Sequence, residues 1–400
     1  MTDIIERAPV RLTSDNGVVL PRAAGRALAS MPLDAVPAGD WRALSQAVLE
    51  PNGYYLPDWE RAVNASARGR TGVSALCAFD DAPSPALVGL MPVTSLWRAY
   101  KLPLPALVSG HPYGTLCTPL LDRGTSDRAA TRLLQAARTA GAHALVLRDV
   151  ALDGAAMGAI ATALGRDSLR ARVLQIYERA CLDATRDGDE VLQEALGGRK
   201  LNRLRRQRQQ LAEHGAVEFA VARAPRDVVV ALETFLALEA SGWKGRLGTA
   251  LIQHEGDAAF IRRAAAALAE TNQCEIVSLR AGAIAVAAGI VLRHKDRAFY
   301  FKIGIDERFA KYSPGVQLTL DLTRHLCADP AIASADSTAG PDNTMINPIW
   351  RGRIAIGDLL IPLYRRDPMV ELIDMALRAQ RSALGLARRG VHLVRNLRKR

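Results

Sequence analysis

Two spacings of apolar residues alternate along the chain. Segments with apolar residues every three or four positions are interspersed with short, nearly continuous apolar runs. The first pattern is typical of amphipathic helices and the second of buried strands. Over residues 37–185 the two alternate and predict a mixed α/β region. Residues 1–36 contain three prolines and scattered charges without sustained periodicity, so we expect a poorly ordered leader there.

The pattern after residue 190 is richer in strands. It opens with a predicted helix at 190–213, in which six of the ten residues from Arg199 to Arg208 are basic. The later predicted elements are a strand at 217–222, helices at 225–240 and 257–271, strands at 275–280, 284–293 and 297–305, a helix at 315–328, a strand at 332–336, a short helix at 343–350 and a last strand pair at 353–364. We therefore expect a second region over residues 190–365.

The last segment, residues 368–400, has the pattern of an amphipathic helix with a basic face. Its apolar residues recur at spacings of 3, 4 and 7, and eight basic residues lie between Arg378 and Arg400 without an acid. The net charge of +11 is +3 without these eight, so the basic character is local. Such a helix favours an anionic membrane surface, at ~1 kcal/mol per basic residue. Packing against the body of the protein and a frayed terminus are the alternatives.

Length and composition narrow the class of protein. A chain of 400 residues is typical of two or three domains. No apolar run reaches the ~18–20 residues of a membrane span, and no secretory signal is recognisable at the start. The five cysteines are far apart, without a CxxC or Cys/His cluster, so we expect neither disulfides nor a metal site. The simplest expectation is a cytoplasmic protein, peripheral to the inner face of the membrane if the basic segment binds lipid.

Three stretches carry a resemblance to a known family. They are residues 238–250, residues 299–318, and residues 335–342 followed by Trp350. On these, the chain resembles the cellulose-biosynthesis acetyltransferase-like family, a GNAT branch whose members pair two GNAT-like lobes, as FemAB-type peptidyltransferases do. The resemblance implies an α+β fold of two GNAT-like lobes, 37–185 and 190–365, each a mixed β-sheet flanked by helices. The basic amphipathic helix would follow them.

The resemblance also implies a donor, the thioester of coenzyme A. Its acyl arm would lie between two splaying strands, 297–305 and 332–336, whose backbones would bind the pantetheine amides. A turn that opens a helix, at Lys311–Gln317, suits the pyrophosphate because free N–H groups and the helix dipole meet there. We assign Lys311, Tyr312, Ser313, Gly315 and Val316 to this site. Only Gly315 matches the usual family turn, and an ordinary strand-to-helix turn is the alternative.

Acyl transfer also needs a base, an oxyanion site and an acid for the thiolate. Asp336 is the first candidate carboxylate because it ends an apolar strand where the acyl group is expected; the alternative is a turn aspartate. Asp306 ends the neighbouring strand and is the second candidate, with a turn role favoured. His294 precedes a polar turn and is expected to be exposed. The family's usual tyrosine acid has no counterpart before Trp350, and Tyr312 is a weak substitute.

A glycine-rich loop at 241–249 presents an aromatic and cationic side chains. We assign Trp243 and Lys244 to the acceptor or cofactor wall, with a helix C-cap followed by a packed tryptophan as the alternative. Glu239 lies one turn upstream and is a candidate base. These assignments rest on the position of the loop within the family motif.

Three functions follow from this pattern. The leading one is an acyl-CoA-dependent acyltransferase acting on an amine or hydroxyl of an envelope-related acceptor, an exopolysaccharide or lipid precursor. The others are a FemAB-like transferase that uses aminoacyl-tRNA and a non-catalytic accessory protein of polysaccharide synthesis. The basic run at 199–208 is interpreted as a solvated helix face, because no aromatic interleaving supports RNA binding. Nucleic acid is therefore not an expected partner.

Overall fold

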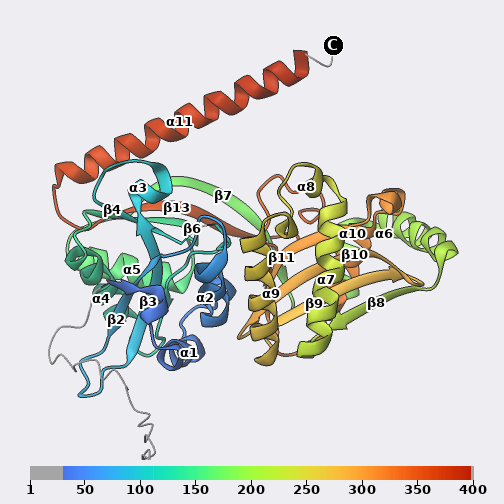
Figure 1. Ribbon diagram of the computed structural model, residues 1–400, viewed down its shortest axis with the longest axis horizontal. Coiled ribbons are helices and arrows are strands. Elements are labelled where there is room, and N and C mark those ends of the chain that lie inside the picture. The colour runs from blue at the N-terminus through green and yellow to red at the C-terminus, as the bar shows by residue number, and fades with distance from the viewer. Residues whose placement is uncertain (1–29, 111, 398–400) are drawn as a thin grey trace, which may run out of the picture.

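The computed structural model describes residues 30–110 and 112–397 of the chain, which fold as a mixed α+β protein (Figure 1). A 13-stranded sheet runs through this part of the chain in the order β1-β2-β3-β4-β6-β13-β7-β12-β11-β10-β9-β8, with β5 beside β3. The strands are β1 (Ser30–Pro32), β2 (Ser74–Phe79), β3 (Leu87–Ser95), β4 (Ala106–Ser109), β5 (Leu120–Leu121), β6 (Ala144–Ala151), β7 (Arg172–Asp183), β8 (Val217–Ala222), β9 (Cys274–Ala281), β10 (Ile284–His294), β11 (Arg297–Ile305), β12 (Ser334–Asp336) and β13 (Gly352–Pro362).

Helices cover both faces of the sheet. In the half of the molecule that contains β8–β12, α7 and α9 lie on one face and α6 and α10 on the other (Figure 1). The helices are α1 (Ala38–Ala47), α2 (Pro57–Ser66), α3 (Leu96–Tyr100), α4 (Ser126–Thr139), α5 (Ala155–Arg166), α6 (Gly188–Leu211), α7 (Pro225–Ser241), α8 (Trp243–Arg246), α9 (Glu255–Glu270), α10 (Pro314–Cys327) and α11 (Pro368–Leu397).

Helix α10 illustrates how the sequence sets these elements. Pro314 stands in its first turn, where no backbone N–H is needed. Leu318, Leu322 and Leu326 follow at intervals of four and are buried against the sheet. The helix therefore starts at a proline and is held by one apolar stripe.

The two halves of the sheet repeat one arrangement. In the first, β3 and β4 are antiparallel, and β4 pairs in parallel with β6 after the chain has passed through α4. In the second, β10 and β11 are antiparallel, and β11 pairs in parallel with β12 after α10. The fold class predicted from the sequence, two GNAT-like lobes with mixed sheets flanked by helices, is confirmed.

Strands β7 and β13 join the halves. Strand β7 pairs with β12 of the second half, and β13 lies between β7 and β6 of the first half. The pair predicted at 353–364 is thus a single strand, and it completes the first half of the sheet. Local patterning identifies a strand but not its partner, which explains this error. The boundary between residues 185 and 190 stays a prediction, because the sheet is continuous across it.

Three other local expectations differ from the structure. Residues 30–32, which were predicted to belong to a poorly ordered leader, form β1 and pair with β2, and residues 1–29 of that prediction lie outside the described part. Residues 343–350 form turns and not a helix. His294 is buried, with Nδ1 accepting from Asn52 N at 2.9 Å and Nε2 lying 2.9 Å from Ser45 O. Burial lowers the pKa of His294. These partners come from the other half of the molecule, beyond the reach of local pattern.

Helix α11 spans Pro368–Leu397, which confirms the helical prediction for the described part of residues 368–400. Val370, Ile373 and Leu377 are buried against a cluster that includes β4, β6 and β13. The rest of the helix continues past the body of the protein (Figure 1). Among the helices of the described residues, none has the length and apolar character needed to cross a bilayer.

Candidate active site

Strands β11 and β12 stay together for only three residue pairs. Their pairing runs from Arg297 with Ser334 to Phe299 with Asp336. Strand β11 then continues to Ile305, whereas β12 ends and the chain turns away. One edge of β11 is therefore left without a strand partner beyond Phe299, as the splayed-strand expectation requires.

A β-bulge interrupts β11 at this point. Val291 of β10 is opposite Tyr300, but Ile290 is opposite Lys302, so Phe301 is the extra residue. A bulge bends the strand and changes which face the following side chains occupy. Phe301 packs with the core on the α7 side, and Lys302 reaches Glu239 of α7. Two consecutive side chains thus point to one face, which the sequence pattern did not indicate.

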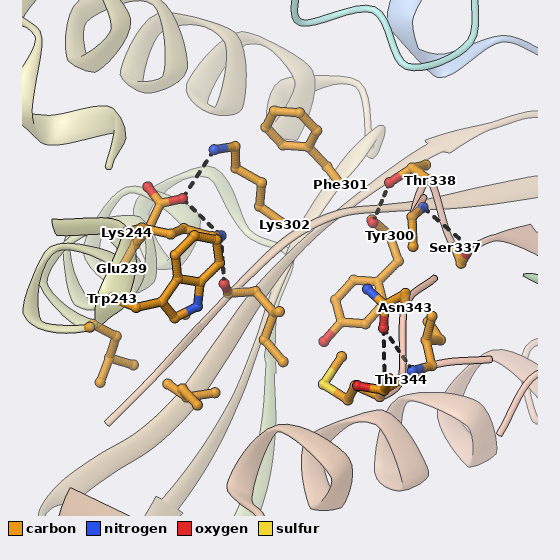
Figure 2. A pocket seen from close by; sticks show the side chains of 18 of the residues that line it. Glu239, Trp243, Lys244, Tyr300, Phe301, Lys302, Ser337, Thr338, Asn343 and Thr344 are labelled. Carbon is orange, nitrogen blue, oxygen red and sulfur yellow. Dashed lines mark hydrogen bonds and ion pairs between the residues drawn. The ribbon is translucent and has the colours of Figure 1, made fainter. Parts of the chain in front are cut away.

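A cavity of about 490 Å³ lies along this free edge (Figure 2). It is bounded by the end of α7, by α8, by the second half of β11 and by the segment after β12. Its lining residues are Leu238, Glu239, Gly242, Trp243, Lys244, Tyr300, Phe301, Lys302, Ile303, Gly304, Ile305, Ser337, Thr338, Ala339, Asp342, Asn343, Thr344, Met345 and Ile346. Three residues predicted from the sequence, Glu239, Trp243 and Lys244, are among them.

Glu239 is the centre of a charged cluster in this cavity (Figure 2). Its Oε1 accepts from Lys244 Nζ and from Lys302 Nζ, each at 3.1 Å, and its Oε2 accepts from Leu251 N at 2.9 Å. The side chain is fully buried. Burial alone would raise the pKa of Glu239, but Lys302 and Lys244 outweigh it, and the pKa is lowered. Glu239 is therefore ionised at neutral pH and engaged at both oxygens.

Two carbonyl groups of β11 near this cavity are capped by side chains. Lys244 Nζ donates to Ile303 O at 3.0 Å, and Thr338 Oγ1 donates to Tyr300 O at 2.6 Å. An extended molecule with amide groups could bind this strand edge as a further strand would. Its N–H groups would then replace the side-chain donors at the carbonyl oxygens. Trp243 stands at the cavity with 53% of its surface exposed.

Asp336 lies behind the cavity lining. It is 2% exposed, its Oδ2 lies 3.2 Å from Arg179 Nη1, and its Oδ1 accepts from Thr338 N at 2.7 Å. Tyr54 comes from the first half of the molecule, and its buried hydroxyl has no hydrogen-bond partner among the described residues. Burial raises the pKa of Tyr54. Asp336 does not line the cavity itself, but it binds the backbone N–H of Thr338, which does.

The predicted phosphate-binding residues lie at the start of α10. Asp306 caps the 3₁₀ turn Glu307–Tyr312 that leads into the helix, and its carboxylate binds Arg308. Tyr312 is buried, with its hydroxyl 3.1 Å from His214 Nε2. The exposed Lys311 places Nζ 4.7 Å from the centre of the Tyr312 ring. Asp306 and Tyr312 therefore have structural contacts of their own.

Gly315 connects this helix start to the cavity. A Cβ at position 315 would lie 3.1 Å from Sδ of Met345, which lines the cavity, and 3.3 Å from Ile305. Ser313 precedes it in a left-handed conformation, with φ 55°. Val316 follows and is half-buried. Gly315 therefore lies next to the cavity, and none of the five predicted residues is part of its lining.

The charges of the cavity determine what it can do chemically. Two ammonium groups beside a free strand edge can stabilise the negative charge that develops on a carbonyl oxygen during acyl transfer. Burial lowers the pKa of Lys244, and the negative charge of Glu239 opposes that change. In the described residues, no group of three or more His, Cys, Asp or Glu side chains is placed to hold a metal ion.

Comparison with known families gives one match, in the second half of the chain. Residues 198–343 match the acetyltransferase (GNAT) domain family. This segment includes the cavity lining up to Asn343 and the start of α10. The chain thus has a GNAT-type fold, and part of its second half is similar to the acetyltransferase (GNAT) domain family.

Solved structures resemble nearly the whole chain. The C-terminal domain of a protein named as a lysylphosphatidylglycerol synthetase, from Agrobacterium fabrum, matches with a TM-score of 0.51 at 15% identity, covering 85% of this chain and 96% of that one. FemX matches with a TM-score of 0.52 at 11% identity, covering 86% and 99%. A conserved protein of unknown function from Bacteroides thetaiotaomicron matches with a TM-score of 0.50 at 10% identity, covering 82% and 97%. No curated protein matches the sequence. At these identities the likeness concerns the fold.

Proposed function

We propose that this chain is an acyl-CoA-dependent acyltransferase that moves an acyl group to an amine or hydroxyl. One observation carries the proposal: β11 presents a free edge to a cavity, and α10 begins directly behind it. An extended arm with amide groups can pair with such an edge as a further strand would. A helix N-terminus suits a diphosphate at the end of that arm. Coenzyme A has both parts.

The donor's phosphate end would bind at Lys311, Tyr312, Ser313, Gly315 and Val316. Backbone N–H groups of the first turn of α10 would hold the diphosphate, and the exposed Lys311 would pair with it. Gly315 allows close approach because it has no side chain. The adjacency of Gly315 and the cavity-lining Met345 supports this placement.

The basic flank of α6 supports a phosphate-rich donor. Arg199, Lys200, Arg203 and Arg206 line a surface groove of about 590 Å³, and none forms an ion pair within the described part of the chain. The next residue, Gln207, donates from Nε2 to Lys311 O at 2.9 Å, so this flank adjoins the start of α10. The unpaired cations would attract the nucleotide phosphates of the donor.

The chemistry follows from the Glu239 cluster. We infer that Lys302 stabilises the oxyanion of the tetrahedral intermediate, since its ammonium lies beside the free edge that would hold the thioester. Lys244, whose pKa is lowered by burial, would receive the proton of the attacking amine or hydroxyl once it has released its own. The electron pair of the breaking C–S bond leaves with the thiolate of coenzyme A, which the ammonium of Lys302 also neutralises.

The three predicted carboxylates take positioning roles in this proposal. Glu239 holds both lysines, and its engaged oxygens argue against direct proton transfer. Asp336 fixes the backbone of Thr338, whose hydroxyl caps the β11 edge. Asp306 caps the turn that leads into α10.

The acceptor is proposed to be an exopolysaccharide or lipid precursor of the cell envelope. Two observations support it: the resemblance of residues 238–250, 299–318 and 335–342 to the cellulose-biosynthesis branch, and the basic helix at the C-terminus. The acceptor would enter from the side of α8, where Trp243 is exposed. The protein would then act in the cytoplasm, at the inner face of the membrane.

A second candidate is transfer from an aminoacyl-tRNA. The basic flank of α6 favours it as well, because RNA and coenzyme A both present phosphates there. FemX and the protein named as a lysylphosphatidylglycerol synthetase share the fold. A non-catalytic accessory role in polysaccharide synthesis is the third candidate. It differs from both in predicting that no substitution in the Glu239 cluster changes activity.

Ligand binding measured by thermal unfolding tests the donor. Coenzyme A or an acyl-CoA at 100 times its dissociation constant should add about 2.7 kcal/mol to the free energy of unfolding. Thr344 is exposed and lines the cavity, so Thr344→Trp should block the cavity and abolish the shift while leaving the ligand-free protein as stable as before.

Three outcomes separate the candidates. Stabilisation of the wild type alone supports the acyl-CoA donor. Equal stabilisation of the wild type and Thr344→Trp places the ligand elsewhere and contradicts the proposed site. No shift with any acyl chain length, together with binding of charged tRNA, selects the second candidate.

A further inference from the structure

The segment that carries Lys244 has no buried residue of its own. Helix α8 and the turn after it span residues 243–249, and each of these residues is at least partly exposed. Trp243 and Leu247 are 53% and 64% exposed. Apolar packing therefore contributes little to the position of this segment, and polar contacts must hold it against the rest of the second half.

Lys244 itself makes two of these contacts. Its Nζ donates to Glu239 Oε1 at 3.1 Å and to Ile303 O at 3.0 Å (Figure 2). Gln253 of the following turn donates from Nε2 to Gly245 O at 2.7 Å. A donor that pairs with the edge of β11 would compete with Lys244 for Ile303 O. The segment then needs a contact that does not depend on that edge.

Glu307 provides such a contact. Its Oε1 accepts from the first amide of α8, Trp243 N, at 2.7 Å and from Arg246 Nη2 at 3.1 Å, and its Oε2 lies 2.8 Å from Arg246 Nη1. Gly242 is the N-cap residue of α8 and has no side chain that could accept from these amides. The hydrogen bond from Arg246 lowers the pKa of Glu307, so the carboxylate is ionised at neutral pH. Glu307 therefore binds both the first and the last residue of α8.

Glu307 lies on the turn that leads into α10. It is the first residue of the 3₁₀ turn Glu307–Tyr312, which Asp306 caps and which is followed by Ser313 and the start of α10 at Pro314. The proposed phosphate-binding residue Lys311 belongs to the same turn. One carboxylate thus joins the turn at the donor's phosphate end with the segment that carries Lys244.

We propose that Glu307 is a positioning residue for acyl transfer, which holds α8 and with it Lys244 beside the edge of β11 while the donor occupies that edge. The inference rests on the proposed function. The donor's amide would replace Lys244 at Ile303 O, and the contacts of Glu307 would keep the amine next to the thioester. A donor bound at the start of α10 would also order the turn that bears Glu307, so donor binding would order α8 as well.

Hydrogen exchange measured by mass spectrometry tests the contact without any reaction. Glu307→Ala removes the acceptor of Trp243 N and of Arg246. The amides of residues 245–249 should then exchange about tenfold faster or more, because a hydrogen bond to a charged group is among the stronger ones. Glu307→Gln keeps an acceptor for Trp243 N and should exchange much like the wild type. Coenzyme A should slow exchange of these residues in the wild type and less so in Glu307→Ala.

Acyl transfer measures the consequence for Lys244. In Glu307→Ala, kcat should fall about 10- to 100-fold with little change in the KM for acyl-CoA, because a catalytic group displaced by about an ångström loses its reactive geometry. Glu307→Gln should recover most of the lost kcat. Thermal unfolding of both variants should stay close to that of the wild type, since 34% of the Glu307 side chain is exposed.

Glu233→Ala is the matched control. Glu233 binds Arg262 through both oxygens, at 2.6 and 2.9 Å, between α7 and α9 and outside the cavity lining. Its substitution should change neither exchange at residues 245–249 nor kcat. The inference is overturned if Glu307→Ala leaves this exchange unchanged, or if exchange rises while kcat does not fall. A wild type that transfers no acyl group contradicts the proposed function instead, and the exchange comparison still shows whether Glu307 holds α8.

Discussion

The described part of the chain contains the same strand geometry twice, and the cavity lined by Glu239 lies beside the second copy. Strands β4 and β6 pair in parallel from Ala106–Ala144 to Val108–Val146 and then separate, as β11 and β12 do after their own three pairs. In the second half the separation leaves a free edge beside a cavity. In the first half, residues 112–118 lie against the end of β6, where Cys117 N donates to Asp149 O at 3.1 Å. We call residues 112–118 the filling segment. Splayed strands alone therefore do not make a site.

Polar side chains hold the filling segment in place. Asn52 Nδ2 donates to Leu116 O at 3.0 Å and to Thr118 O at 2.9 Å. Cys117 Sγ lies 3.1 Å from Gly110 O. Arg70 Nη1 donates to Pro112 O at 2.6 Å. The filling segment is thus anchored at both of its ends.

We expect the largest effect, a loss of stability, from removing the buried ion pair that holds the filling segment in place. Arg70 and Glu60 are 1% and 0% exposed and form an ion pair at 2.5 Å. Burial raises the pKa of Glu60, and Arg70 opposes that rise. Arg70→Met leaves a buried carboxylate without its partner and should lower the free energy of unfolding by about 3–5 kcal/mol, measured by urea denaturation.

The control for this change removes both charges. Glu60→Gln/Arg70→Met leaves no uncompensated charge and should recover most of the lost stability. If the first half serves only as scaffold, both variants should bind acyl-CoA with unchanged affinity at a temperature where they are folded. A stable Arg70→Met protein that loses acyl-CoA binding would show that the first half takes part in the site.

The second largest effect is expected on kcat, from a substitution in the cavity of the second half. Lys302→Met keeps the aliphatic stem beside Phe301 and removes the ammonium group. Glu239 retains Lys244 and the Leu251 N–H, so the fold should survive. If Lys302 stabilises the oxyanion, kcat should fall about 100- to 1,000-fold, with a smaller change in KM.

Lys295→Met is the matched control for Lys302→Met. Lys295 is a lysine of the same half, outside the cavity lining, that donates to Gln46 O, and its substitution should leave kcat unchanged. An unchanged kcat in Lys302→Met would show that Lys302 does not stabilise the oxyanion. If Lys244→Met were also fully active, the acyl-transfer roles proposed for both lysines would be wrong.

Local patterning in the sequence was sufficient for the elements that form the open half. The strands predicted at 217–222 and 297–305 coincide with β8 and β11. Gly315 was identified because a proline and a glycine open an amphipathic stretch. Glu239, Trp243 and Lys244 were found through the family motif and line the cavity. Each of these depends on neighbours close in the sequence.

Features that depend on distant partners were missed. The bulge at Phe301 can be recognised only from the pairing of β11 with β10. The sequence of β13 indicates a strand but does not show whether it pairs with the first or the second half of the sheet. Lys302 was overlooked because strand alternation alone does not place it beside Glu239. Non-local pairing determines such features.

The smallest effect would show whether the free edge binds the donor. Thr338 Oγ1 caps Tyr300 O, and Thr338→Val removes this hydrogen bond with little change of shape. The free energy of unfolding should fall by about 1 kcal/mol.

If the donor's amides bind β11, the freed Tyr300 carbonyl gains a partner in the complex, and acyl-CoA affinity should rise by up to about fivefold, the equivalent of one such bond. Thr344→Val is the control, because Thr344 lines the same cavity without a hydrogen bond to β11 among the described residues. Calorimetry measures both variants. Weaker binding in Thr338→Val would mean that the hydroxyl itself contacts the donor. The donor would then bind the hydroxyl of Thr338 and not the backbone carbonyl of Tyr300. In that case the β11–β12 pair would differ from the β4–β6 pair through its side chains and not through its free backbone edge.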